Sequence, residues 1–220
     1  MKKCEGRPED CIYKLLKNKI IKKELFPNCQ IVETQLVKET GISRTPIRTA
    51  LKRLNYEGMV TIIPNHGAFV SNPTLNEVKG VYECKKLLES ASIRLACNNI
   101  TDEQVYLLDE LLKQEIETHA RRDLYQFIKV NTKFHLLIAK ASKNICYEKF
   151  IAELIAKSNI YLIFYDDFIF TSANNSCALQ DHIRIVKSLK ARDINDCVKA
   201  IEKHNQVTLD QLSLNGIIQY

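Results

Sequence analysis

The stretch Gly41-Ile42-Ser43-Arg44-Thr45-Pro46-Ile47-Arg48 decides how the first third of the chain folds. Glycine has the backbone freedom that a tight turn between helices needs, so Gly41 is predicted to end one helix. Ser43 or Thr45 can cap the next helix. Pro46 suits the first turn of that helix, where the N–H that proline lacks would be unsatisfied in any case. The stretch therefore predicts a helix, a short turn and a second helix.

The helix after the turn has two chemically different faces. Ile47, Leu51 and Leu54 recur at helical spacing and are predicted to be buried. The basic residues of the segment fall outside this apolar face: Arg44, Arg48, Lys52 and Arg53. Arginines near the N-terminal end of a helix that follows a short turn are typical of the recognition helix of a helix-turn-helix.

Two β-prone runs follow this helix, Met59–Ile63 and Ala68–Val70, with Pro64-Asn65-His66-Gly67 between them. This pattern predicts a β-hairpin. A hairpin directly after a recognition helix is a wing, whose tip at Asn65, His66 and Gly67 is expected to reach the adjacent minor groove. The alternative is a hairpin that only covers the core.

Two further helices are predicted before the turn. An apolar repeat indicates a helix from Pro8 to Leu25, ended by Phe26-Pro27-Asn28, and a short helix spans Glu33–Thr40. The helix after Gly41 is expected to stop near Gly58. Three helices and a hairpin in this order make a winged helix-turn-helix.

The positive charge of the chain is concentrated in this part. The net charge is +6; residues 1–74 hold 13 Lys and Arg against 7 Asp and Glu, whereas residues 75–220 hold 19 of each. A basic module joined to a neutral one is typical of a polyanion-binding domain with a partner domain. Ser71-Asn72-Pro73-Thr74 breaks the pattern. We therefore predict a DNA-binding domain over residues 1–73 and a second domain over residues 74–220.

The second domain is predicted to be an all-α antiparallel bundle, because it shows helical patterns and no strand-like alternation. Thr101-Asp102-Glu103-Gln104 and Asp193-Ile194-Asn195-Asp196 are typical helix starts. Six helices are expected: Leu75–Asn98, Thr101–His119, Asp123–Ser142, Ile145–Phe168, Asn174–Ala191 and Ile194–Leu214. The predicted fold class is thus mainly α, with one small β-hairpin.

Three of the five histidines form a pattern in this bundle. Asn131 and His135 are four residues apart and share one face of a helix. His182 falls near the start of the fifth bundle helix, and His204 follows 22 residues later in the last one. Neutral imidazoles that converge inside a bundle can hold zinc, nickel, iron or manganese. On spacing alone, packed or exposed histidines are the commoner explanation.

The cysteines and the hydropathy of the chain indicate the cellular compartment in which it acts. The eight cysteines include no C-x-x-C pair, so we predict free, mostly buried thiols and no zinc finger. The longest uncharged apolar run, Ile160–Tyr165, is far shorter than the ~18 residues of a membrane span. The first residues, Met1–Glu5, lack the apolar run of a secretory signal. A cytoplasmic protein with no membrane partner is expected.

The same motifs resemble a known family. Leu36–Leu54 together with Pro64–Val70 is similar to the winged helix of GntR transcriptional regulators. The second domain resembles the FCD effector domain of the FadR subfamily. Asn131-Thr132-Lys133-Phe134-His135 matches the D/N-x-x-F-H helix of that domain, and Asp181–Val186 with His204 matches its later histidines. Six helices rather than seven resemble the shorter, VanR-like form.

The resemblance implies a homodimeric regulator, more specifically a repressor, whose affinity for a double-stranded operator responds to a small carboxylate effector. It implies a divalent transition metal, with zinc or nickel favoured, held by Asn131, His135, His182 and His204. The arginine that binds the effector carboxylate in the family corresponds to Lys85, which keeps the charge but lacks the bidentate fork. Contacts with DNA are expected from the recognition helix and the wing tip: Ser43, Arg44, Thr45, Arg48, Lys52, Arg53, Asn65, His66 and Gly67.

Some residues depart from the family pattern. Asn131 stands where the family more often has Asp, and its amide oxygen is a neutral, weaker ligand. Three neutral histidines and an asparagine would leave the 2+ charge of an ion uncompensated, which favours an anionic effector. Thr34 replaces a frequent Arg and Thr49 the usual Glu, so the base preferences are expected to differ from those of better-known members.

Two alternatives stay open. A three-histidine site could activate water in a metal-dependent hydrolase. However, the nearby carboxylates, Asp181 and Glu202, belong to a helix start and to another helix face, and no nucleophile motif accompanies them. No enzyme is therefore expected. Alternatively, a metal could only brace the bundle of a constitutive DNA-binding protein, and its removal would then unfold the bundle.

Overall fold

The computed structural model describes residues 6–215, with side chains described up to residue 212. The chain divides into two compact units, residues 1–73 and 74–220. No helix within the described residues is long and apolar enough to cross a membrane.

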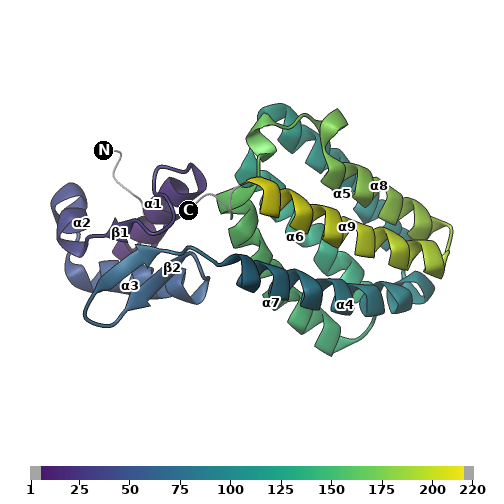
Figure 1. The fold of residues 1–220 in the computed structure, drawn as a ribbon, viewed down its shortest axis with the longest axis horizontal. Helices are drawn as coiled ribbons and strands as arrows, with labels where there is room; N and C mark the ends of the chain where they lie inside the picture. The colour runs from purple at the N-terminus through teal and green to yellow at the C-terminus, as the bar shows by residue number, and fades with distance from the viewer. Residues whose placement is uncertain (1–5, 216–220) are drawn as a thin grey trace. The chain divides into compact units, whose positions relative to one another are not determined.

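The first unit combines three helices with a small antiparallel sheet (Figure 1). The helices are α1 (Pro8–Ile21), α2 (Glu33–Thr40) and α3 (Arg44–Tyr56). The sheet has the order β1-β3-β2 and consists of β1 (Gln30–Ile31), β2 (Val60–Ile63) and β3 (Gly67–Val70). In its register, Gln30 pairs with Phe69 and Val60 with Val70. The apolar repeats of the helices supply most of the core: Ile12, Leu16, Ile20, Leu36, Ile47, Leu51 and Leu54.

The turn between α2 and α3 forms at glycine, as the sequence predicts. Gly41 has a φ of 70° at the end of α2, and its N–H donates to the carbonyl of Val37. Ser43 occupies the position before α3, but its side chain makes no capping hydrogen bond. The backbone conformation at Gly41, rather than a Ser43 cap, therefore sets this turn.

Two details of the first unit differ from the prediction. Helix α1 ends at Ile21 instead of Leu25, because Lys23 takes up a left-handed conformation with a φ of 56°, which a right-handed helix cannot contain. Strand β1 was not predicted, because two residues are too few to show an alternating pattern.

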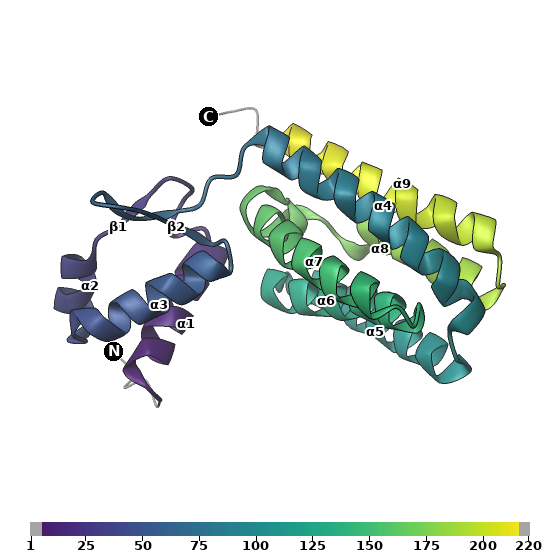
Figure 2. The same cartoon turned by 90° about the horizontal axis from the view of Figure 1, so that it is seen from below.

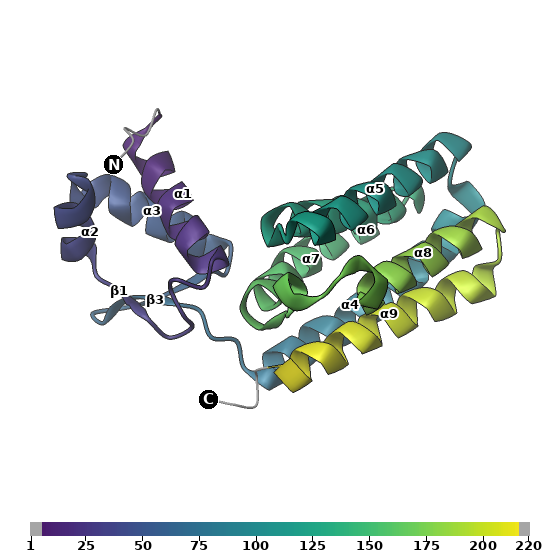
Figure 3. The same ribbon diagram turned by 90° about the horizontal axis from the view of Figure 1, so that it is seen from above.

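The second unit is a bundle of six long helices within the described residues (Figures 2 and 3). Helix α4 packs against α9, α7 and α6, while α5 packs against α6 and α8, and α8 lies along α9. The helices are α4 (Leu75–Asn99), α5 (Asp102–Arg121), α6 (Leu124–Ala141), α7 (Ile145–Tyr165), α8 (Cys177–Lys190) and α9 (Ile194–Asn215). The mainly α fold class predicted from the sequence is confirmed.

Side-chain caps fix most helix starts in the bundle. Thr74 and Glu77 form a capping box at α4, and Thr101 and Gln104 form another at α5. Each box satisfies two backbone N–H groups that the first turn of a helix leaves free. At α8 the Ser176 hydroxyl accepts from the N–H of Leu179 at 3.2 Å. This cap starts α8 at Cys177, three residues later than predicted.

The connection from α7 to α8 is less helical than predicted. Asp166 has an extended ψ of 146°, so α7 ends at Tyr165 rather than Phe168. Two short 3-10 turns follow, η1 (Phe168–Phe170) and η2 (Ala173–Asn175). The ring of His119 on α5 lies 4.4 Å from that of Phe168, which holds the connection against the bundle.

The cysteines do not form the free, mostly buried set that was expected. Cys11 takes part in a disulfide. Among the free cysteines that the structure describes, Cys97 and Cys197 are buried, whereas three are exposed: Cys84, Cys146 and Cys177.

Candidate metal centre and nucleic-acid interface

Three histidines from three helices meet inside the bundle: His135 of α6, His182 of α8 and His204 of α9. Their exposed fractions are 3%, 0% and 4%. One ring nitrogen from each lies within 4.8 Å of the others. The amphipathic pattern of the helices explains this position, because each histidine falls on the buried face of its helix.

Each of the three rings has one buried nitrogen without a hydrogen-bond partner among the described residues. These nitrogens are Nε2 of His135, Nε2 of His182 and Nδ1 of His204. Buried polar atoms are normally partnered, so three unpartnered nitrogens in one place call for a ligand. Imidazole nitrogen is a preferred ligand atom for divalent transition ions such as zinc. The donor set therefore fits such an ion.

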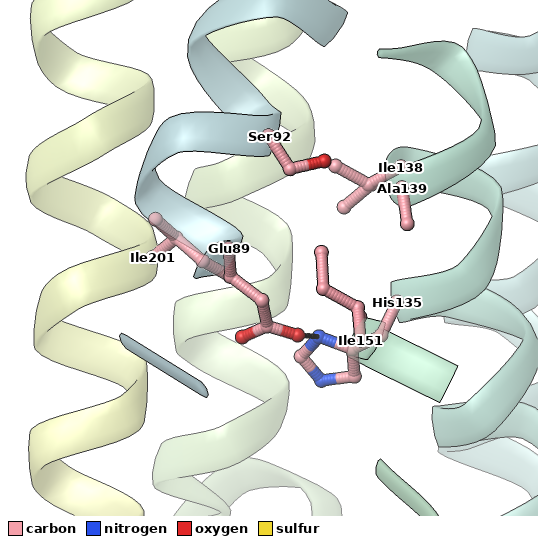
Figure 4. A pocket seen from close by; sticks show the side chains of 7 residues that line it. All are labelled: Glu89, Ser92, His135, Ile138, Ala139, Ile151 and Ile201. Atoms are coloured by element: carbon pink, nitrogen blue, oxygen red, sulfur yellow. Dashed lines mark ion pairs between the residues drawn. The ribbon is translucent and has the colours of Figure 1, made fainter. Parts of the chain in front are cut away.

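Two carboxylates contact the opposite side of two of these rings. Nδ1 of His182 lies 2.8 Å from Oε2 of Glu115 on α5, and Nδ1 of His135 lies 2.8 Å from Oε1 of Glu89 on α4. Figure 4 shows the Glu89 carboxylate facing the His135 ring. Neither carboxylate is predicted from the sequence, because neither lies close to its histidine along the chain. Glu115 and His182 are 67 residues apart.

Lys85 is buried beside this cluster, and its ammonium group is already paired with a carboxylate. Its Nζ lies 3.0 Å from Oε2 of Glu89 and 3.0 Å from Oδ1 of Asn205. Asn205 in turn donates from Nδ2 to Glu89 Oε2 at 2.7 Å. Lys85 is thus the counter-charge of Glu89. Because Lys85 matches Glu89, only the Glu115 carboxylate beside His182 would offset part of the 2+ charge of an ion held here.

Burial controls the protonation of the cluster. It lowers the pKa of His135 to about 4, with a further contribution from Lys85. Burial, followed by the neighbouring histidines and Lys85, also holds the pKa of His204 well below its usual range. Burial alone would raise the pKa of Glu89, but Lys85 and His135 outweigh it and hold that pKa well below its usual range. The His135 and His204 imidazoles are therefore neutral, as ligands must be, and Glu89 is charged.

Asn131 is the remaining predicted ligand. It lies one turn before His135 on α6 and is 7% exposed. Its position on the helix is thus the one that the sequence indicated.

A small cavity adjoins the cluster (Figure 4). Its polar lining residues are Glu89, Ser92 and His135, and the rest of its wall is apolar. Its volume of about 10 Å³ suffices for roughly one water molecule. A larger ligand can reach this side of His135 only if the packed helices move.

The predicted DNA-contacting residues are all exposed. Arg44 and Arg48 lie on the first two turns of α3. Nε of Arg48 lies 2.9 Å from Oε2 of Glu33 at the start of α2, and the Arg48 side chain is 61% exposed. Within the part of the chain that the structure describes, Arg44 and Lys52 form no ion pair and are available to phosphates.

Arg53 differs from the other basic residues of α3. Its guanidinium carbon lies 3.8 Å from the ring centre of Tyr13 on α1, and Nη1 lies 3.2 Å from Oδ1 of Asp10. Nε of Arg53 also approaches Glu57 at 3.7 Å. These contacts tie α3 to α1, so the charge of Arg53 is partly used within the unit.

The tip of the hairpin is an exposed turn. Asn65 and Gly67 have φ angles of 62° and 107°. The backbone carbonyl of His66 accepts a hydrogen bond from Nε2 of Gln30 at 3.0 Å, which fixes the tip to β1. The hairpin is also joined to α3, because Asn55 accepts from the N–H of Ile62 at 3.1 Å.

Two protein families match the chain. The family described as bacterial regulatory proteins of the gntR family matches residues 8–70, and the FCD domain matches residues 80–207. The Nta operon transcriptional regulator of Aminobacter aminovorans is 27% identical over 186 residues, which cover 84% of this chain and 85% of that protein. The transcriptional repressor RspR of Escherichia coli K12 is 26% identical over 195 residues, or 89% of this chain and 84% of the repressor. McbR/YncC of E. coli shares the fold, with a TM-score of 0.71 and 22% identity over 95% of this chain and 98% of its own.

Proposed function

Because the chain belongs to the GntR family of bacterial transcriptional regulators and carries an FCD domain, we propose that it is a ligand-responsive repressor that binds a double-stranded operator as a homodimer. The family consists of transcriptional regulators, so the chain is a DNA-binding regulator and not an enzyme, which removes the metal-dependent hydrolase. We place its action in the cytoplasm, where the operator lies.

For the DNA-binding surface we propose α3 and the tip of the β2–β3 hairpin. Arg44 and Arg48 would contact bases or phosphates in the major groove, and Asn65, His66 and Gly67 would approach the minor groove. Ser43, Thr45 and Lys52 would add phosphate contacts, while Arg53 contributes less because α1 already holds it. Two copies on two half-sites would multiply the specificity of one short helix.

For the second unit we propose a divalent transition metal, zinc or nickel first, held by His135, His182 and His204. The observation that carries this proposal is the meeting of three buried, unpartnered imidazole nitrogens in an FCD domain. Asn131 would be a fourth, weaker ligand. When bound, the ion would supply a localised positive charge that attracts an anionic group.

The buried charges indicate which anions fit best. Glu89 and Glu115 carry two negative charges and Lys85 one positive charge, so a 2+ ion would leave the site with about one net positive charge. A carboxylate would neutralise it. Lys85 would meet the carboxylate only after leaving Glu89, and we therefore assign the effector to the ion first.

Effector binding would then act on the operator through the bundle. The cavity beside His135 is too small for a carboxylate of several heavy atoms. Binding would therefore favour a bundle conformation different from the one described, and a preference for one conformation is what couples two sites.

The test begins with elemental analysis of the protein purified without chelator. We expect about one transition ion per chain, lost in His182→Ala and retained in His119→Ala, which alters a histidine of α5 outside the cluster. Operator binding is then measured by fluorescence anisotropy with a panel of carboxylates. Absence of metal from the wild type, even after incubation with Zn²⁺ or Ni²⁺, would reject the metal centre. Operator affinity unchanged by every carboxylate would instead support a metal that only braces the bundle.

A further inference from the structure

We propose that Glu89 and Glu115 are positioning residues that fix His135 and His182 as Nδ1–H tautomers, so that both rings present Nε2 to one ion while His204 presents Nδ1. The inference rests on the proposed metal centre for its purpose. It concerns proton positions in the metal-free protein, however, and these can be observed without any ion.

The pair of His182 and Glu115 shows the principle. Oε2 of Glu115 lies 2.8 Å from Nδ1 of His182, and the two side chains are 1% and 0% exposed. An ionised carboxylate can only accept a hydrogen bond, so the proton must sit on Nδ1. A neutral imidazole with its proton on Nδ1 has its lone pair on Nε2. That atom is the one left without a partner in the cluster.

Glu89 approaches Nδ1 of His135 as an ion pair, and two further residues hold its carboxylate. Its Oε2 accepts from Lys85 and Asn205, at 3.0 Å and 2.7 Å. Its Oε1 lies 2.8 Å from Nδ1 of His135 without the alignment of a hydrogen bond, and a charge this close still favours the proton on Nδ1. Asn205 and Lys85 come from α9 and α4. The carboxylate is therefore held by two helices before it reaches the ring on α6. Such outer partners orient ligating histidines in metal sites and raise their basicity.

Among the described residues His204 has no carboxylate partner, and its unpartnered buried nitrogen is Nδ1 rather than Nε2. In the proposed site it would carry its proton on Nε2, so that Nδ1 offers a lone pair to the ion. The ion-bound cluster would thus have a distinctive signature, namely two Nδ1–H rings and one Nε2–H ring. Random packing of three histidines would not impose this pattern, and neither would the helical spacing of the sequence.

The experiment is nitrogen NMR of the metal-free full chain labelled with ¹⁵N-histidine, recorded near pH 7.5. Long-range correlations between ring protons and nitrogens distinguish the two neutral tautomers. Spectra of single histidine variants assign the five rings. We expect Nδ1–H for His135 and His182, the two rings that face carboxylates. An Nε2–H tautomer at His182 would overturn the proposal.

A second measurement uses Glu115→Gln, because an amide can donate or accept and no longer dictates the tautomer. We expect mixed tautomers at His182 and a loss of Zn²⁺ affinity of about 10- to 100-fold, measured by competition with a chromogenic chelator. Glu117→Gln is the matched control, since Glu117 lies on the same helix with its side chain 65% exposed. Unchanged tautomers together with unchanged Zn²⁺ affinity in Glu115→Gln would contradict the proposal.

Glu89→Gln alone would leave the buried Lys85 without its counter-charge and could fail to fold. The double variant Lys85→Met with Glu89→Gln removes both charges, so it tests the His135 tautomer without leaving an unpaired buried charge. If the wild type shows the expected tautomers but binds no Zn²⁺, the metal centre fails while the tautomer assignment stands. If it binds Zn²⁺ with other tautomers, only the positioning role of the carboxylates fails.

Discussion

The Arg48 side chain of α3 is paired with the Glu33 carboxylate of α2 through its Nε atom, at 3.0 Å to Oε1 and 2.9 Å to Oε2. Neither terminal amino group of the guanidinium takes part in this pair. An exposed pair of this kind stabilises the fold by less than about 1 kcal/mol. In the proposed interface, its main effect would be to orient the fork of Arg48 before the operator binds.

Arg48→Ala should therefore weaken operator binding by about 1–3 kcal/mol if the fork reads a base. Arg48→Lys should recover little of this loss, because lysine cannot form a bidentate contact. Fluorescence anisotropy with the operator and with scrambled DNA separates loss of specificity from loss of charge. Lys14→Ala is the control, since Lys14 is exposed on α1. Equal operator affinities for Arg48→Ala and the wild type would exclude Arg48 from the interface.

Replacing Gly67 at the hairpin tip is expected to destabilise the first unit. Its φ of 107° strains any residue with a Cβ atom, and a Cβ there would lie 3.4 Å from Nε2 of Gln30. We expect Gly67→Ala to lower the free energy of unfolding of the first unit by about 1–2 kcal/mol. Gly80→Ala on α4 is the contrast, because it faces open space without a positive φ and should stabilise its helix by about 0.5–1 kcal/mol. Urea denaturation measures both changes, and a neutral Gly67→Ala would mean that the tip relaxes freely.

Local signals explain how much of the fold was predictable. The apolar repeat around Leu36 and the glycine at position 41 set the bounds of α2, which match the structure. The capping box at Thr101 likewise places the start of α5 correctly to one residue. Helix ends without such a signal were misplaced. At Lys23 and Asp166 it is the backbone conformation of ordinary residues that stops the helix, and composition does not reveal it.

Part of the candidate site could likewise be predicted from the sequence, and part could not. The helical positions of His135, His182 and His204 follow from sequence patterns and from the family resemblance. Their partners Glu89 and Glu115 do not, since those carboxylates come from α4 and α5 and meet the rings only through tertiary packing. The role of Lys85 changed for the same reason. A buried lysine with a carboxylate at 3.0 Å is a counter-charge, whereas the sequence shows only a cation at a family ligand position.

Metal removal should lower the stability of the bundle without unfolding it. The apolar core cluster includes Ile93, Phe134 and Ile185, all with 0% exposure, and it contains none of the three histidines. We expect a metal-free protein with native helical circular dichroism and a lower Tm. Saturating Zn²⁺ at about 100 times its Kd should restore about 2.7 kcal/mol. A chelated protein that loses its helical signal would instead support the alternative of a purely structural metal.

The metal-free protein should also become less stable in mild acid. The pKa of His135 is lowered to about 4, mainly by burial, whereas an unfolded histidine titrates near 6.5. Between these values the unfolded chain binds a proton that the folded chain does not, so the free energy of unfolding decreases as the pH falls. His204 shifts in the same direction. Urea denaturation at pH 7 and pH 5 should show this decrease. In His135→Gln the free energy of unfolding should change less between these two pH values. An equal change in the free energy of unfolding in both proteins would mean that His135 is protonated within the fold.

The charge of the proposed site predicts which effectors act. Glu89, Glu115 and Lys85 leave about one positive charge once a 2+ ion is bound. One carboxylate neutralises it, whereas a dicarboxylate would bury an excess negative charge, which is costly in an apolar interior. We therefore expect monocarboxylates to change operator affinity at lower concentration than dicarboxylates of similar size. Glu115→Gln raises the net charge of the loaded site by one and should shift this preference toward dicarboxylates. Anisotropy titrations of operator complexes with matched pairs of acids measure the shift, and an unchanged order of potency in Glu115→Gln would show that the buried charge does not select the effector.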